Sequence, residues 1–131
     1  MDYEEYVNQA HQAAQLVEDG EHERALSIFR LLLSSDISDL DKAMMCHNIG
    51  VVQEKIGNER EALTSYEQGM SYERLHGRSF LAEQRAGFLY RTGKLAESLR
   101  AYEELLHRAS LTEEEKQRMR HNIAALREQI G

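Results

Sequence analysis

The sequence predicts an all-α protein made of stacked helix-turn-helix repeats, and three observations lead to this prediction. Proline is absent and β-branched residues are scarce, with four Val, six Ile and three Thr in 131 residues. Ala, Leu and Glu, which favour helix, contribute 13, 16 and 18 residues. Glycines recur at nearly constant intervals, at Gly20, Gly57, Gly93 and Gly131. A period of this length indicates stacked units in place of one globular core.

Each of these glycines lies in the same surroundings. A small residue stands seven positions before it, and an aromatic residue stands nine positions after each of the first three. The small residues are Ala13, Gly50, Ala86 and Ala124, and the aromatic residues are Phe29, Tyr66 and Tyr102. The segment 42–57 also matches the segment 116–131 at 8 of 16 positions. We therefore interpret each glycine as the turn after the first helix of a unit.

The physical sense of the pattern is a pair of antiparallel helices joined at glycine. Glycine adopts the left-handed conformation that closes a helix at little steric cost. The small residues let the two helices approach closely, and the aromatic residue fills the groove toward the next unit. One unit cannot bury its own apolar stripe, whereas three stacked units can.

The elements follow in order from this pattern. The helix pairs are expected at 2–19 and 22–34, at 40–56 and 59–76, and at 79–92 and 95–109, with a single last helix at 113–130. Ser and Asp residues of the segment 34–39 can accept the first backbone N–H groups of the next helix. Thr112 and Glu115 form a capping-box signature at the start of the last helix. The prediction is one domain over residues 1–131, with repeats at about 2–36, 39–77 and 78–110 and a capping helix at about 112–130.

The last helix has no partner helix after it in this sequence. Three interpretations stay open. It is the terminal cap that repeat arrays need, the chain is part of a longer array, or the exposed flank pairs with another copy.

Composition excludes several classes of protein. The chain is 41% hydrophobic and 30% charged, which fits a globular domain and neither a collagen-like nor a disulfide-scaffold protein. Its wholly apolar runs are only a few residues long, against roughly 20 for a membrane-spanning helix, so no membrane insertion is expected. A single cysteine and no charged-then-apolar leader predict a cytoplasmic location. The net charge of −7 makes nucleic acid an improbable partner.

Candidate chemical sites are few, and each has a simpler interpretation. The acidic corner with His22, at 19–23, is either a metal site or a solvated turn, and the pattern favours the turn because three ligands of fixed geometry are not implied. Cys46 is either a reactive thiol or, beside Met45 and Ile49, a small buried hydrophobe, and the second is favoured. We expect no catalytic residue, no metal and no cofactor.

The stretch from Asn48 through Gly57 and Ala62 to Tyr66 resembles the helix-turn-helix signature of the tetratricopeptide repeat family. The resemblance extends over the whole chain. Two features depart from the family pattern: the usual proline of the second helix is missing, and the period exceeds the family's length of about 34 residues. The resemblance implies a right-handed superhelix of three repeats and a capping helix, about seven helices in all. It also implies a concave groove, lined by the first helix of each repeat, for a peptide or helix of another protein.

Helical spacing, counted back from each turn glycine, selects the residues of that groove. They are Met44, His47, Asn48, Val51, Lys55, Phe80, Gln84, Tyr90, Arg91, Arg118, His121 and Asn122. The amides of Asn48, Gln84 and Asn122 stand at equivalent positions and can pair with the backbone of an extended ligand. The alternative for an amide is a bridge between neighbouring helices, and for Met44 or Phe80 it is a place in the core.

One specific function within the family does not fit. Tetratricopeptide domains that hold the acidic C-terminus of heat-shock chaperones carry Lys, Asn or Arg at five places. Here those places hold Ala10, Ala14, Asn48, Phe80 and Gln84, one match in five. Basic residues elsewhere keep an acidic or carboxylate ligand open, namely Lys55, Arg91, Arg118 and Arg120.

The sequence thus predicts a non-catalytic adaptor that binds a segment of a partner protein in the groove. A self-associating scaffold that dimerises through the incomplete C-terminal repeat is the alternative, and a homodimer is therefore possible. Binding of single-stranded RNA is a third hypothesis, which the acidic charge disfavours. An enzyme is the least favoured class.

Overall fold

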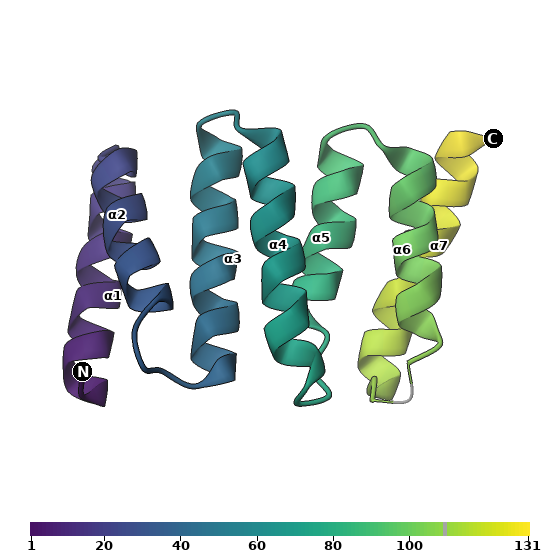
Figure 1. Cartoon of the computed structure of the whole chain (residues 1–131). Helices are drawn as coiled ribbons and strands as arrows, with labels where there is room; N and C mark the ends of the chain where they lie inside the picture. The colour runs from purple at the N-terminus through teal and green to yellow at the C-terminus, as the bar shows by residue number, and fades with distance from the viewer. Residues whose placement is uncertain (109) are drawn as a thin grey trace.

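The computed structural model describes residues 1–108 and 110–131, which form seven α-helices and no strand (Figure 1). The helices are α1 (Tyr3–Glu18), α2 (His22–Leu33), α3 (Asp39–Lys55), α4 (Glu59–Arg74), α5 (Phe80–Arg91), α6 (Leu95–Leu106) and α7 (Glu113–Ile130). The predicted all-α array of seven helices is confirmed. The observed ends agree with the expected ones to within two residues, except that α6 ends at Leu106. The last residue expected in that helix, Ala109, lies outside the described part of the chain.

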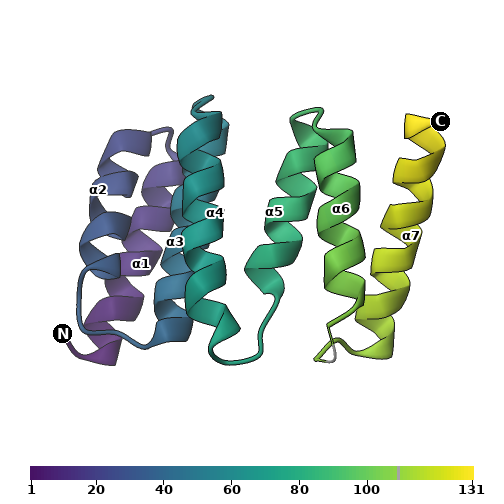
Figure 2. The same ribbon diagram turned by 45° about the vertical axis from the view of Figure 1, so that its right-hand side comes forward.

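Helices that are neighbours in the sequence are also neighbours in space. The seven helices stand side by side in an array, with the N-terminus at the α1 end and the C-terminus at the α7 end (Figure 1). Turned by 45°, the array still shows α5, α6 and α7 as successive upright helices (Figure 2). The most extensive contact joins α3 to α4, the pair that carries the best repeat signature.

The repeated glycines close the first helix of each pair, as predicted. Gly20, Gly57 and Gly93 have φ of 79°, 86° and 80°, in the left-handed region that favours glycine. After Gly57, the N–H of Asn58 donates to the carbonyl of Gln53 at 2.8 Å, which satisfies one of the last free carbonyls of α3.

The predicted caps are present at α3 and α7. The Ser38 hydroxyl accepts the N–H of Asp41 at 3.1 Å. At α7, the N–H of Glu115 donates to the Thr112 hydroxyl at 3.1 Å, and the N–H of Thr112 donates to the Glu115 carboxylate at 2.9 Å. These reciprocal bonds complete the capping box.

The start of α5 is capped from a distance. Glu73, near the end of α4, is 2% exposed, and its two carboxylate oxygens accept the N–H of Leu81, each at 2.9 Å. One of them also accepts the N–H of Ala82 at 3.2 Å. Burial raises the pKa of Glu73, and the bonds from the backbone oppose that rise. The Glu73 carboxylate thus caps α5, whose own N-cap residue, Ser79, makes no side-chain cap hydrogen bond.

The core follows the repeat, because the small residues and the aromatic residues meet between the helices. Ala13 and Ala86 are fully buried, and a Cβ on Gly50 would lie 2.6 Å from the ring of Tyr66. Ala124 differs from these three, because it is exposed and no described helix covers it. The predicted close contact at small residues is therefore confirmed for the three hairpins.

Among the described residues, no helix is both long enough and apolar enough to cross a membrane.

Candidate functional site

The first helices of the hairpins, with α7, form one face of the array, which we call the inner face. Three depressions follow one another along it. Each is bounded by two successive helices out of α1, α3, α5 and α7, and the helix between them in sequence supplies the floor. The inner face therefore has one depression for each step of the repeat.

The first depression lies between α1 and α3 and has a volume of about 290 Å³. Its floor is Phe29 of α2, which is 2% exposed. The remaining lining residues are Ala14, Val17, Glu18, His47, Asn48, Val51, Val52 and Lys55. Four predicted groove residues on α3 are thereby brought together.

The second depression lies between α3 and α5 and has a volume of about 400 Å³. Tyr66 of α4, 1% exposed, forms the floor. The other lining residues are Val51, Glu54, Lys55, Gln84 and Arg91. Because Val51 and Lys55 line both depressions, the first two are continuous along α3.

The third depression lies between α5 and α7 and has a volume of about 230 Å³. Tyr102 of α6 forms its floor, and the other lining residues are Tyr90, Asn122, Ala125, Leu126 and Gln129. The amide of Gln129 donates to the Tyr90 hydroxyl at 3.1 Å, so the two helices are linked across this depression.

The three depressions share one composition. Each is lined by one of the predicted amides, Asn48, Gln84 or Asn122, and each is floored by one of the periodic aromatic residues, Phe29, Tyr66 or Tyr102. The amides were predicted as site residues, whereas the aromatic residues were predicted only as packing residues. Their fixed distance after each glycine is the signal that identifies them as the floors.

A bidentate ion pair crosses the inner face between α3 and α5. Arg91 donates from Nε to Glu54 Oε1 at 2.7 Å and from Nη2 to Glu54 Oε2 at 3.1 Å. The Tyr66 hydroxyl donates to the same carboxylate at 2.9 Å. These bonds hold the pKa of Glu54 below its usual value, while burial and the carboxylate raise the pKa of Tyr66. The hydrogen bond to Glu54, which is itself held by Arg91, thus fixes the Tyr66 ring at the floor of the second depression.

A second bidentate pair crosses between α5 and α7, where Arg118 donates to Glu83 at 2.7 and 2.9 Å. Two of the four basic residues that left an acidic ligand open, Arg91 and Arg118, are therefore neutralised by carboxylates. A third, Arg120, lies away from the inner face in a pocket between α6 and α7. Among these four residues, Lys55 is the one that is exposed beside the depressions outside these ion pairs.

His47 lines the first depression and is half-buried. Its ring meets Phe80 edge to face, with the ring centres 5.0 Å apart, and lies 6.2 Å from the ring of Tyr66. Burial lowers the pKa of His47, and the side chain of Gln84 partly offsets this shift. The ring is therefore neutral at neutral pH. The equivalent His121 is exposed and lines none of the three depressions.

The predicted apolar contacts are available at the surface. Met44, Phe80 and Tyr90 expose 41%, 43% and 41% of their area, so none of them is a core residue. Met44 and Phe80 line none of the depressions, although Phe80 contacts His47 at the margin of the first. Whether these side chains contact a ligand stays a prediction.

The structure bears on the two candidate chemical sites of the sequence, Cys46 and the corner at 19–23. Cys46 is fully buried, and burial raises the pKa of its thiol to about 11, so it behaves as the small hydrophobe that was favoured. Within residues 1–108 and 110–131, no three His, Cys, Asp or Glu side chains gather as metal ligands would, and this includes the corner at 19–23.

Comparison with known proteins places the fold. The chain is similar to the type III secretion chaperone SycD of Yersinia enterocolitica in complex with a peptide of the translocator YopD. The TM-score is 0.74 at 18% identity, over 99% of this chain and 98% of that one. It is similar to PcrH from Pseudomonas aeruginosa, with a TM-score of 0.74 at 17% identity, over 97% and 95%. A second SycD structure matches with a TM-score of 0.74 at 18% identity, over 97% and 91%. No family model and no curated protein sequence matches.

Proposed function

We propose that this protein is a non-catalytic binding module that holds an extended segment of a partner protein along the inner face. The observation that carries the proposal is the register of the three depressions, each with one amide and one aromatic floor. We propose further that the chain is a member of the tetratricopeptide repeat family and that its three hairpins and α7 act as one unit.

The chemistry of the depressions suits a peptide better than a small molecule. An amide side chain both donates and accepts, so a row of three can pair with a peptide backbone whatever its side chains are. Between the amides, Val51 and Ala125 offer apolar contact to alternate side chains of an extended chain. A small ligand usually binds in one enclosed cavity, whereas the inner face has three separate depressions.

The inner face is held in shape before any ligand arrives. The pairs Glu54–Arg91 and Glu83–Arg118 join α3 to α5 and α5 to α7 at distances of 2.7 Å. Ordering fewer side chains on binding lowers the entropic cost of association. The same pairs leave little net charge on the inner face, which favours a neutral and apolar segment over a strongly acidic one.

The structural neighbours support this proposal. SycD of similar fold is described in complex with a peptide of a translocator protein. At 18% identity that likeness supports the fold alone. The support for a peptide ligand comes from the amides and the aromatic floors of this chain. We propose a protein or peptide partner and no nucleic acid, and we place the protein in the cytoplasm, where a free thiol such as Cys46 stays reduced.

Selection from a library of unstructured peptides displayed on phage tests the proposal. Peptides selected on the wild-type protein are measured again on a variant that combines Asn48→Ala, Gln84→Ala and Asn122→Ala. Each lost hydrogen bond is worth about 0.5–1.5 kcal/mol, so the triple variant is expected to bind at least about tenfold more weakly.

The matched control removes three exposed amides outside the depressions, Gln12→Ala, Gln68→Ala and Gln117→Ala. It is expected to bind like the wild type. Equal loss in both variants, or no loss in the first, would contradict the proposed site. Failure to select any peptide on the wild type would contradict the proposed function itself.

A further inference from the structure

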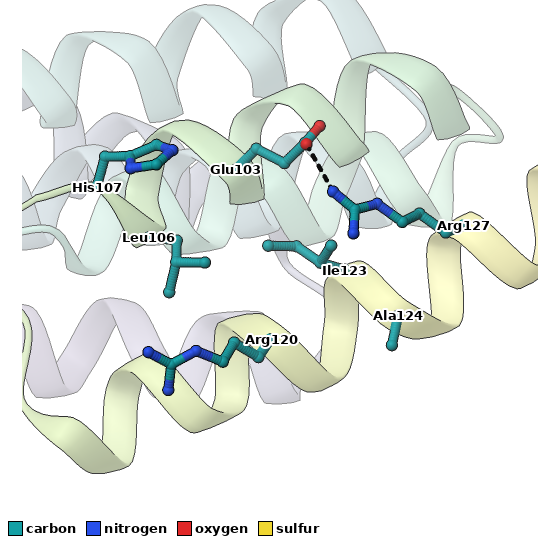
Figure 3. A pocket seen from close by; sticks show the side chains of 7 residues that line it. All are labelled: Glu103, Leu106, His107, Arg120, Ile123, Ala124 and Arg127. Carbon is teal, nitrogen blue, oxygen red and sulfur yellow. Dashed lines mark hydrogen bonds and ion pairs between the residues drawn. The ribbon is translucent and has the colours of Figure 1, made fainter.

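A fourth hollow lies between α6 and α7, on the side of α7 turned away from the inner face. It has a volume of about 390 Å³. Leu106 and Ile123 reach into it from the two helices, and Ala124 borders it (Figure 3). On a helix with about 100° per residue, Ala124 lies about 160° away from Asn122 and Leu126, which line the third depression. This outer hollow is therefore independent of the inner face.

The repeat identifies what occupies the same place elsewhere in the molecule. Seven residues before Gly57, Gly93 and Gly131 stand Gly50, Ala86 and Ala124. At Gly50 the helix α4 packs against α3, with the ring of Tyr66 lying against the glycine. At Ala86 the helix α6 packs against α5, and the Ser98 hydroxyl donates to the Ala86 carbonyl at 2.8 Å. The exposed Ala124 is the third member of this series. The outer hollow thus includes the surface of α7 that is equivalent to the surfaces of α3 and α5 on which α4 and α6 pack.

The outer hollow is basic where the equivalent places are neutral. Four residues before the turn glycine, Gln53 of α3 and Leu89 of α5 are 3% and 0% exposed, and the equivalent residue of α7 is Arg127. Eleven residues before it, Cys46 and Ala82 are 0% and 4% exposed, and the equivalent residue is Arg120. A helix seated on α7 would therefore cover two arginines.

Burying an arginine is costly unless a carboxylate accompanies it. Figure 3 shows Glu103 paired with Arg127 at one end of the hollow, at 3.0 Å, and His107 and Arg120 toward the other. Glu103 is the one carboxylate among the lining residues. Among the described residues Arg127 is paired with Glu103, whereas no carboxylate is paired with Arg120, so the negative charge that a covered Arg120 needs must come from the occupant.

We propose that the outer hollow seats one amphipathic helix of an acidic partner protein. Its contact stripe has small and apolar residues, which lie on Ala124, Ile123 and Leu106. A carboxylate that flanks this stripe meets Arg120, while Arg127 keeps its pair with Glu103. A second copy of this chain is the competing occupant, but the matching stripes of α2, α4 and α6 are already buried in their own hairpins, as Ala25, Ala62 and Ser98 show.

The probe is a helix-stabilised synthetic peptide of residues 95–107, the α6 sequence, because α6 already packs on an alanine equivalent to Ala124. The peptide carries three Glu and one Arg. A second peptide with the three Glu replaced by Gln keeps its shape and removes the acidic charge. Binding of each to the full-length chain is measured by fluorescence anisotropy at low and high salt.

Two substitutions in the outer hollow are compared with two outside it. Ala124→Trp fills the hollow and Arg120→Glu reverses its charge, and both residues are exposed, so folding is unaffected. Ala96→Trp and Arg100→Glu are the matched controls at exposed positions of α6 that do not line the hollow. Circular dichroism verifies that all four variants are folded.

The wild type is expected to bind the acidic peptide, with affinity that falls as salt rises. Ala124→Trp and Arg120→Glu are each expected to weaken binding about tenfold or more, and the controls to leave it unchanged. No binding by the wild type, equal binding by Ala124→Trp, or equal affinity for the Gln peptide would each overturn the assignment. A wild-type dimer that Ala124→Trp dissociates would assign the hollow to a second copy instead. Peptides selected on the inner face are expected to bind Ala124→Trp normally, so the two proposals fail separately.

Discussion

Gly50 offers a direct measure of how tightly the second hairpin is packed. In an exposed helix, changing Gly to Ala stabilises the protein by about 0.5–1 kcal/mol, because Gly loses more backbone entropy on folding. At Gly50 the new Cβ would lie 2.6 Å from Tyr66 Cε1 and 2.8 Å from Cδ1. Movement of the ring is restricted, since Phe88 lies 5.6 Å from it, centre to centre, and its hydroxyl is bonded to Glu54.

Gly50→Ala is therefore expected to destabilise the protein. Overpacking of this kind costs about 1–3 kcal/mol, which exceeds the gain in helix propensity and leaves a net loss of about 1 kcal/mol. The matched control is Gly87→Ala on α5, where the new Cβ would meet Arg91 Nη1 at 3.1 Å, which a shift of a few tenths of an ångström at the end of that side chain relieves, and the Tyr102 hydroxyl at 3.7 Å. That variant is expected to gain about 0.5–1 kcal/mol.

Urea denaturation followed by circular dichroism measures both variants. In a Tyr66→Leu background the obstructing ring is gone, so the penalty of Gly50→Ala is expected to vanish in a double-mutant cycle. If Gly50→Ala instead stabilises the protein as much as Gly87→Ala does, the ring is not wedged and the close-packing argument fails. Peptides that occupy the second depression are expected to lose affinity in Gly50→Ala, because the displaced ring is its floor.

Three further changes test the turn, the remote cap and the half-buried imidazole of His47. Gly57→Ala is expected to cost about 1 kcal/mol in thermal unfolding, because φ of 86° is strained for a residue with a Cβ, and an unchanged melting temperature would contradict this. Glu73→Gln removes one of two oxygens that cap α5 and is expected to cost about 1–3 kcal/mol, with faster amide exchange at Leu81 and Ala82, whereas unchanged exchange there would argue against the cap. His47 has a folded pKa below its unfolded value near 6.5, so its contribution to stability is complete above that pH and is lost as pH falls through the lower folded pKa. His47→Gln is accordingly expected to flatten the stability profile on the acid side of pH 6.5, and a profile as steep as that of the wild type would refute the assignment.

The helices and turns could be predicted from the sequence because their causes are local. Helix propensity, the glycine that ends each first helix and the capping box of Thr112 act within one or two turns of chain. The row of Asn48, Gln84 and Asn122 was also predictable, since the repeat places equivalent residues on the same side of successive helices. The aromatic floors carried the same signal, and their role in the depressions became visible only once the helices were packed.

Other features required the tertiary structure. The pairs Glu54–Arg91 and Glu83–Arg118 join residues that are 37 and 35 positions apart, and their distance depends on how successive helices settle against each other. Glu73 finds the start of α5 only because the chain bends back after α4, and Ala124 is exposed although its sequence context is that of buried residues. Periodicity fixes which side of a helix a residue occupies, whereas the presence of a neighbour on that side is a property of the assembled array.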